Sequence, residues 1–319
     1  MENSAPEVAR QIIKKLKESD NICIITHKSP DMDTLGSALG LYHALRKLGK
    51  KVKVAHDVQI ARKYLFLFEG YVDSDFDVNL FVTVDIATPA LFPRETTCDR
   101  GIDICIDHHI KNEIPAALKL VRADAAATGE IIYDIINLLG VAIDEKIACC
   151  LYVAIATDTG CFRQPNTTAN SHKIVASLME TGIDYALINK NIFGFESLKD
   201  FELKKIFFSN AEFFFGGKLA LVVITKDILQ QVGLGQEEID SGLYSELIKV
   251  EGVCISAVLR EKGDYTKVSL RTNEGYNASE IANQWNNGGG HKRAAGCCIK
   301  GPVAEAKRVI IDTLEAELQ

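Results

Sequence analysis

The sequence predicts an α/β fold in two domains. Short apolar runs alternate with segments of helical periodicity over the first half, and this pattern changes after residue 210. The chain has 319 residues, of which 47% are hydrophobic and 25% charged. This chain is longer than a single hydrophobic core ordinarily supports, and its composition is that of a globular protein. Strands that alternate with helices indicate a mostly parallel sheet covered by helices on both faces.

Four short apolar runs predict the strands of the first domain at 21–26, 52–55, 80–84 and 102–106. Apolar residues at three- and four-residue spacing predict helices at 34–48, 128–139 and 146–157. Gly49 follows the first of these helices, in the position where glycine commonly ends a helix.

The second half has the pattern of a smaller α/β domain. We expect a hairpin over 213–224, a second strand pair at 253–260 and 265–271, a glycine-rich loop at 288–296 and a closing helix at 302–318. We therefore predict a first domain at 1–185, a connecting helical linker at 186–210 and a second domain at 211–319.

Charge and composition limit the partners. The net charge of −7 argues against binding of long nucleic acid, which normally requires a basic face. No apolar run approaches the roughly 18 residues needed to span a membrane, and no signal peptide is visible, so we expect a cytoplasmic protein without membrane contact. The nine cysteines, an odd number without a Cys-x-x-Cys pair, fit a reducing compartment.

Polar residues that suit metal binding follow several predicted strands. They are His27, Asp31 and Asp33 after the first strand, Asp85 after the third, Asp107, His108 and His109 after the fourth, and Asp158 in a later helix. In an open α/β sheet, ligands bind beyond the carboxyl ends of the strands. We therefore expect these side chains to converge on one edge.

The donor types predict two divalent ions. Carboxylate oxygens combined with imidazole nitrogens suit Mn²⁺, Mg²⁺ or Zn²⁺. Four carboxylates and two histidines are too many ligands for one ion, but they suit two ions roughly 3.5–4 Å apart with a bridging carboxylate. We expect Mn²⁺, with Mg²⁺ and Co²⁺ as alternatives.

Two motifs carry a family resemblance. The pattern HxxPDxDxxGS from His27 to Ser37, followed by Asp107-His108-His109, resembles the DHH phosphoesterase superfamily. The sequence GGGHKRAAG, from Gly288 to Gly296, resembles the DHH-associated C-terminal domain. Together, in this order and spacing, they resemble the stand-alone oligoribonuclease and pAp phosphatase group over nearly the whole chain.

The resemblance implies a role for each matching residue. It implies that His27 and Asp31 bind one metal, that Asp33, His108 and Asp158 bind the other, and that Asp85 bridges them. It implies further that His109 contacts the substrate phosphate or assists the leaving oxygen, while Asp107 orients a histidine.

The resemblance also implies substrate-binding residues. They are Arg163 in the first domain and Ser269, Arg271, Gly288, Gly289, Gly290 and His291 in the second. Independently of the family, glycines without a Cβ let backbone N–H groups approach a phosphate closely. The fork-shaped guanidinium of Arg271 suits a terminal phosphate.

These expectations predict a metal-dependent phosphoesterase in which a hydroxide bridging the two metals attacks phosphorus. The implied substrates are short oligoribonucleotides, linear pApA and 3′-phosphoadenosine 5′-phosphate (pAp). The sequence leaves open whether the protein forms a homodimer. One alternative is an inorganic pyrophosphatase or exopolyphosphatase, although the GGGH motif speaks against a pyrophosphatase. Another is a nucleotide- or RNA-binding module without catalysis.

Overall fold

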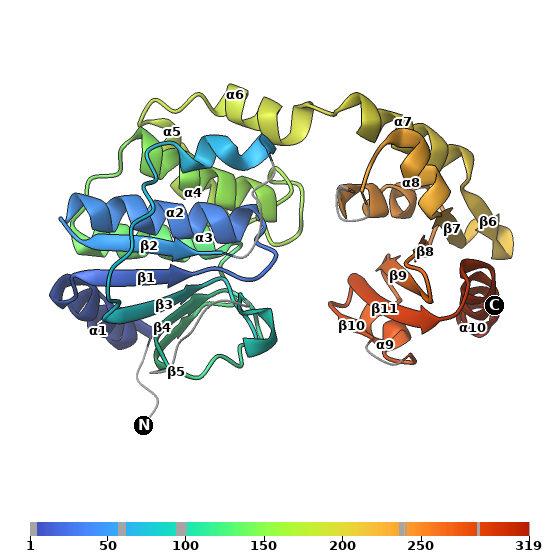
Figure 1. The fold of residues 1–319 in the computed structure, drawn as a ribbon, viewed down its shortest axis with the longest axis horizontal. Coiled ribbons are helices and arrows are strands. Elements are labelled where there is room, and N and C mark those ends of the chain that lie inside the picture. The colour runs from blue at the N-terminus through green and yellow to red at the C-terminus, as the bar shows by residue number, and fades with distance from the viewer. Residues whose placement is uncertain are drawn as a thin grey trace. The chain divides into compact units, whose positions relative to one another are not determined.

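The computed structural model describes residues 5–56, 62–93, 101–235, 239, 241–285 and 288–318. The chain forms two compact units, Met1–Phe195 and Glu196–Gln319, each with its own sheet (Figure 1). The first sheet is parallel and the second is mixed, which confirms the predicted α/β class. Within the described part of the chain, every helix is too short or too polar to cross a bilayer.

The first sheet has five strands in the order β2-β1-β3-β4-β5, and all neighbours are parallel. The strands are β1 (Asn21–Ile25), β2 (Lys51–Ala55), β3 (Leu80–Val84), β4 (Ile102–Asp107) and β5 (Ala116–Val121). The sequence did not predict β5. It lies at the sheet edge with several exposed or half-buried residues, so it lacks the continuous apolar run of a central strand.

Successive residues of β1 face opposite sides of the sheet, as the pleat requires. Ile22 and Ile24 pack into the main core. Cys23 and Ile25 face a smaller apolar cluster that includes the loop residue Ile114. The helices of this unit are α1 (Ala5–Glu18), α2 (Met32–Lys47), α3 (Thr128–Leu139), α4 (Glu145–Asp158), α5 (Ala169–Met179) and α6 (Tyr185–Asn189).

Helices α2 and α4 pack closely because α2 carries glycines on the side that faces α4. A Cβ on Gly36 would lie 2.4 Å from the carbonyl oxygen of Cys150. A Cβ on Gly40 would lie 2.9 Å from Cδ2 of Leu151. The two helices share buried residues along most of their length, and this packing fixes the ends of both helices at the carboxyl edge of the sheet.

The second sheet has the order β10-β11-β9-β8-β7-β6. Its strands are β6 (Glu212–Phe214), β7 (Leu219–Ile224), β8 (Ile255–Glu261), β9 (Tyr265–Thr272), β10 (Gly289–Gly290) and β11 (Ala294–Lys300). Strands β7 and β8 are parallel, and the other neighbours are antiparallel. The predicted glycine-rich loop is therefore partly strand, since Gly289 and Gly290 pair with Gly296 and Ala295.

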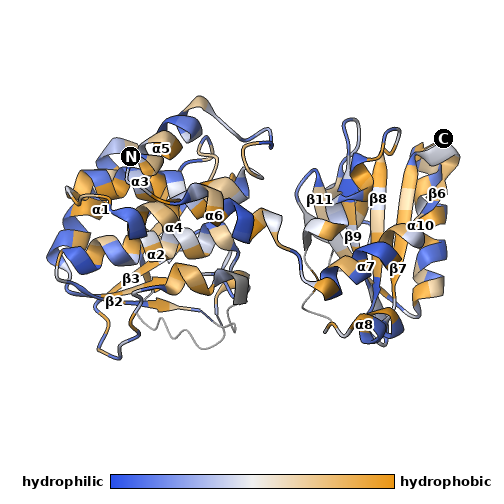
Figure 2. Ribbon diagram, turned by 90° about the horizontal axis from the view of Figure 1, so that it is seen from above, coloured by the Kyte–Doolittle hydropathy of each residue, from blue (hydrophilic) through white to orange (hydrophobic). Residues whose placement is uncertain are grey.

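Helices cover the two faces of this sheet to different extents. The helices are α7 (Leu198–Ser209), α8 (Lys226–Val232), α9 (Ala278–Ala282) and α10 (Val303–Leu318). Val268 and Leu270 of β9 pack with Ile310 of α10, whereas Val222 of β7 packs with Phe207 of α7 on the other face. The central strands are strongly hydrophobic, and α10 is hydrophobic on one side only (Figure 2).

We predict that Gly36→Ala destabilises the protein more than Gly40→Ala does. Alanine gains about 1 kcal/mol in helix propensity at either site. At position 36 the new methyl group meets a backbone carbonyl, which costs about 1–3 kcal/mol, whereas at position 40 it meets a terminal methyl group of the buried Leu151 side chain, which can shift at lower cost. Urea unfolding of both variants measures the difference. Equal free energies of unfolding would contradict the close contact between α2 and α4.

Candidate metal centre

The predicted ligands of the first unit meet at the carboxyl edge of the parallel sheet. Ligand atoms lie within 4.8 Å of one another in three groups: His27, Asp31 and Asp85; Asp33, His108 and Asp158; and Asp85, His108 and His109. Asp85 belongs to two of these groups. The arrangement can therefore hold two cations on either side of one shared carboxylate.

The backbone of Asp85 is left-handed, with φ of 59°. This conformation is uncommon for residues other than glycine, and aspartate and asparagine tolerate it best. The carboxylate is buried and accepts hydrogen bonds from the hydroxyl of Thr34 at 2.6 Å and of Thr128 at 3.0 Å. The turn at the end of β3 thus aims Asp85 into the centre of the cluster.

Asp33 is fixed by the amino terminus of α3. Its carboxylate accepts hydrogen bonds from the backbone N–H of Thr128 at 2.8 Å and of Gly129 at 3.0 Å. The hydroxyl of Ser37 adds a third at 3.0 Å. The positive end of the helix dipole also favours a negative charge at this position. Asp31 caps α2 by accepting a hydrogen bond from the backbone of Thr34.

His108 presents Nε2 to three carboxylates. The Nε2 atom lies 3.7 Å from oxygens of Asp85 and Asp158 and 3.9 Å from an oxygen of Asp33. Its Nδ1 lies 3.3 Å from the carbonyl oxygen of Ala125. When Nδ1 carries the proton, it donates a hydrogen bond to that carbonyl oxygen. Nε2 then keeps its lone pair for a metal ion, which is the usual arrangement of metal-binding histidines.

His109 is held by a different partner. Its Nδ1 lies 2.7 Å from Oδ1 of Asp107, which is fully buried. The amide of Asn112 donates to the other Asp107 oxygen at 2.6 Å. The hydrogen bond to Asp107 raises the pKa of His109 to about 9, so this histidine is protonated near neutral pH and can donate to an anionic oxygen.

Burial and mutual repulsion disfavour the charged form of three of the four carboxylates. Asp31 is the exception, because hydrogen bonds from His27 and Thr34 outweigh its burial and lower its pKa to about 2. Burial, followed by the charge of Asp31, raises the pKa of Asp85 to about 6. Burial and the neighbouring carboxylates raise the pKa of Asp33 well above its usual range, and burial raises that of Asp158. Divalent cations relieve this repulsion, and oxygen and imidazole donors suit them. The residues therefore fit a divalent metal site.

Sequence reasoning missed the uncharged residues that support the cluster. Thr34 and Thr128 donate to Asp85, and Asn112 holds Asp107. Asn166 donates to the backbone oxygen of Asp158 at 3.1 Å and to the carbonyl of Ala126 at 3.0 Å. The only signal was proximity, since Thr34 and Asn112 lie within four residues of a predicted ligand.

The remaining predicted residues lie outside the cluster. Arg163 is exposed, and its Nε donates to the carbonyl of Gly160 at 2.8 Å. It follows three consecutive residues with positive φ, from Gly160 to Phe162. Ser269 and Arg271 lie on β9 of the second unit.

The three glycines of the GGGH motif have different environments. A Cβ on Gly288 would lie 1.8 Å from the carbonyl oxygen of Ala282, and one on Gly290 would lie 2.6 Å from that of Ala294. Close backbone packing therefore explains these two glycines. A Cβ on Gly289 would meet open space. His291 is exposed in the turn between β10 and β11.

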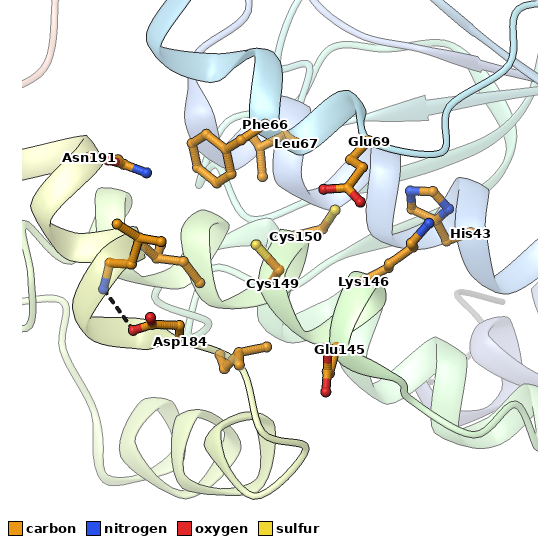
Figure 3. A pocket seen from close by; sticks show the side chains of 13 residues that line it. His43, Phe66, Leu67, Glu69, Glu145, Lys146, Cys149, Cys150, Asp184 and Asn191 are labelled. Carbon is orange, nitrogen blue, oxygen red and sulfur yellow. Dashed lines mark hydrogen bonds between the residues drawn. The ribbon is translucent and has the colours of Figure 1, made fainter.

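A pocket of about 330 Å³ lies at the other end of α4 from Asp158 (Figure 3). His43 of α2, Cys149 of α4 and Leu187 of α6 contribute to its lining. None of the predicted ligands lines it. This pocket is therefore separate from the metal cluster.

Comparisons with known proteins agree with this geometry. The family model described as "DHH family, N-terminal domain" matches residues 21–155, and the model of the DHHA1 domain matches residues 226–319. The chain is 34% identical to the bifunctional oligoribonuclease and PAP phosphatase NrnA of Thermus thermophilus, over 100% of this chain and 98% of the relative. It is 29% identical to a probable protein of the same name from Streptococcus mutans, over 90% and 92%.

A solved structure also aligns over nearly the full length. It is an exopolyphosphatase-related protein from Bacteroides fragilis, with a TM-score of 0.86 and 25% identity, covering 97% of this chain and 96% of that one. The fold and the acidic and histidine cluster define a hydrolase of phosphoester bonds. The chain belongs to the DHH family and carries the associated DHHA1 domain.

We predict that Asp85→Asn stabilises the metal-free protein but abolishes its stabilisation by metal. Asparagine tolerates the left-handed backbone and removes a buried charge whose folded-state pKa is about 6. The raised pKa means that the wild type loses stability as pH rises from about 4 through about 6. The variant gains on the order of 3 kcal/mol above that range.

Thermal unfolding of chelated protein at about pH 8, with and without added Mn²⁺, measures both effects. Ligands that bind only the folded state raise its melting temperature. An undiminished Mn²⁺ effect in the variant would exclude Asp85 as a shared ligand.

We predict that Asp107→Asn lowers the pKa of His109 from about 9 toward the ordinary value of 6.5. The wild-type pair stabilises the fold below about pH 6.5, and this contribution is lost as pH rises through about 9. NMR titration of the His109 ring in metal-free protein measures the shift, and the ring of His172, which is exposed on α5, is the internal control. An unchanged His109 pKa would exclude Asp107 as its main partner.

Proposed function

We propose that this phosphoesterase hydrolyses short oligoribonucleotides, pApA or pAp, using two divalent ions, with Mn²⁺ as the first choice. The observation that carries the proposal is Asp85, which belongs both to the group with His27 and Asp31 and to the group with His108. The names of the full-length relatives, oligoribonuclease and PAP phosphatase, support the substrate class.

In this proposal the ligands divide into two sets around Asp85. His27 and Asp31 hold one ion, and Asp33, His108 and Asp158 hold the other. When bound, the two ions supply Lewis acidity toward a phosphoryl oxygen and lower the pKa of the attacking water. Hydrogen bonds from Thr34 and Thr128 hold Asp85 between the two ligand sets.

His109 acts on the substrate as a proton-bearing group. Asp107 fixes its Nδ1, so the opposite ring nitrogen, Nε2, is available for the substrate. Protonated His109 donates a hydrogen bond to a phosphoryl oxygen or a proton to the departing ribose oxygen. Asp107 positions and charges this ring without touching the substrate.

In this proposal, residues of the second unit bind the substrate. Arg271 of β9 is already oriented, because its Nε donates to the hydroxyl of Ser245 at 3.1 Å and its Nη1 to the carbonyl of Leu270 at 3.0 Å. A guanidinium held in this way loses little freedom when it binds a phosphate. We assign catalysis to residues 1–185, the connection to 186–210 and substrate binding to 211–319.

The first test compares substrates side by side. We expect Mn²⁺-dependent release of mononucleotides from RNA oligomers between dinucleotide and pentanucleotide, and release of phosphate from pAp. Cyclic di-AMP, pyrophosphate and polyphosphate complete the series. Faster turnover of polyphosphate or pyrophosphate than of every nucleotide substrate would replace the proposal with the alternative phosphatase. Tight nucleotide binding without turnover would favour a binding module.

A matched pair of variants on α4 tests the site. We predict that Asp158→Asn lowers kcat at least about 100-fold, because it removes a charged ligand. Asp144→Asn makes the same change at the other end of the helix, where Asp144 is the N-cap. Asparagine caps a helix as well as aspartate does, so this variant keeps wild-type activity. Steady-state kinetics with saturating Mn²⁺ decides, and equal activities would remove Asp158 from the site.

A further inference from the structure

The second unit has an open sheet face that carries positive charge. Val268 and Leu270 of β9 point into the core shared with α10. Because side chains alternate along a strand, Lys267, Ser269 and Arg271 point to the opposite side. Lys267 is exposed, and Ser269 and Arg271 are half-buried. The 3-10 helix Ser241–Ser245 covers this face of β9 in part at the Arg271 end, and Lys267 at the other end is exposed.

The register of the neighbouring strands leaves the middle of this face bare. Strand β11 lies beside β9 (Figure 1), and Gly296 pairs with Ser269. Gly289 of β10 pairs in turn with Gly296. A Cβ on Gly289 would meet open space, so this row consists of one hydroxyl and half-buried backbone without side chains. A flat sugar or base can lie against it without meeting large side chains.

A cation stands on each side of the bare row. Arg271 pairs with Ala294, and Lys267 pairs with Cys298. Successive rows along a strand are about 6.6–6.8 Å apart. Lys267 therefore lies one row beyond Ser269 and two rows beyond Arg271. An oligonucleotide in extended conformation can cover the distance between Arg271 and Lys267 with its following nucleotides.

The hydrogen-bond donors of the β9 side chains differ in whether they already have a partner within the protein. Arg271 is held by Ser245 and Leu270. Among the described residues, the ammonium of Lys267 and the hydroxyl of Ser269 have no hydrogen-bond or ion-pair partner.

We propose that Lys267, with Ser269 and the bare row of Gly289 and Gly296, forms a second phosphate subsite for a nucleotide further along a substrate held at Arg271. This inference rests on the proposed function and adds a determinant of substrate length to it. The subsite contributes to the binding of oligonucleotides that extend past Ser269, and it contributes nothing to pAp or a dinucleotide.

The test measures KM and kcat of Lys267→Gln across pAp, dinucleotide, trinucleotide and tetranucleotide. Losing one exposed phosphate contact raises KM for the tetranucleotide about three- to tenfold and leaves kcat unchanged. KM for pAp and the dinucleotide stays at the wild-type value. The slope of log K against log salt concentration for tetranucleotide binding also becomes shallower by about 0.7, the value for one lost contact to a single-strand phosphate.

Two control variants separate local contact from total charge. Arg308→Gln removes the same charge from the exposed side of α10, which packs on the other face of the sheet, and it leaves KM unchanged for every length. Lys267→Arg keeps the charge and restores tetranucleotide KM. Equal KM changes for dinucleotide and tetranucleotide, or identical behaviour of the two glutamine variants, would overturn the subsite.

A binding measurement keeps this inference distinct from the proposed function. Fluorescence anisotropy with labelled dinucleotide and tetranucleotide is measured in the Asp158→Asn background with Mn²⁺, with and without Lys267→Gln. A length-dependent loss of affinity supports the subsite even when the wild type hydrolyses no RNA, in which case only the proposed function fails. Affinity that does not change with Lys267→Gln at either length overturns the subsite even when hydrolysis is confirmed.

Discussion

The removal of clustered carboxylates from water, together with their repulsion, is the constraint on which the first unit depends. Asp33, Asp85 and Asp158 come from different elements, and each has a pKa above its usual range. Buried like charges separate when the chain around them can yield. Here the chain cannot yield, because Asp33 is bound to the first N–H groups of α3 and Asp85 sits in a left-handed turn between two hydroxyl donors. The protein folds around an electrostatic cost that divalent cations would remove.

The glycines of α2 and α3 make this arrangement sterically feasible. Gly36 lets α2 approach the backbone of α4, and Gly129 lies where a Cβ would be 2.7 Å from Ala154 of α4. Gly129 also donates its N–H to Asp33. A bulkier residue at either position would move the start of α3 or the end of α4, and with it Asp33 or Asp158. Helix packing and ligand geometry are thus determined by the same few contacts.

The sequence predicted most of the charged residues of this cluster because they follow apolar strands, and parallel strands bring their carboxyl ends to one edge. It predicted neither β5, whose edge position leaves a broken apolar pattern, nor the strand pairing of Gly289 and Gly290. Glycine-rich segments carry no side-chain periodicity, so their register depends on the neighbouring strand. Thr128 and Asn166 were missed for a similar reason. Uncharged polar residues are common in turns, and only the folded backbone brings them to Asp85 and Asp158.

The two units solve opposite electrostatic problems. The edge of the first sheet concentrates carboxylates and would repel a phosphate unless cations are bound there. One face of the second sheet carries Arg271 and Lys267 on either side of Ser269, and in the proposed function these cations bind phosphate without any metal. Under the proposed function, affinity for the substrate chain therefore resides mainly in the second unit, and reactivity resides in the first. Under that proposal, a chain with a net charge of −7 can act on polyanions, because cationic side chains of the second unit contact the phosphates and divalent cations would offset the acidic groups of the first.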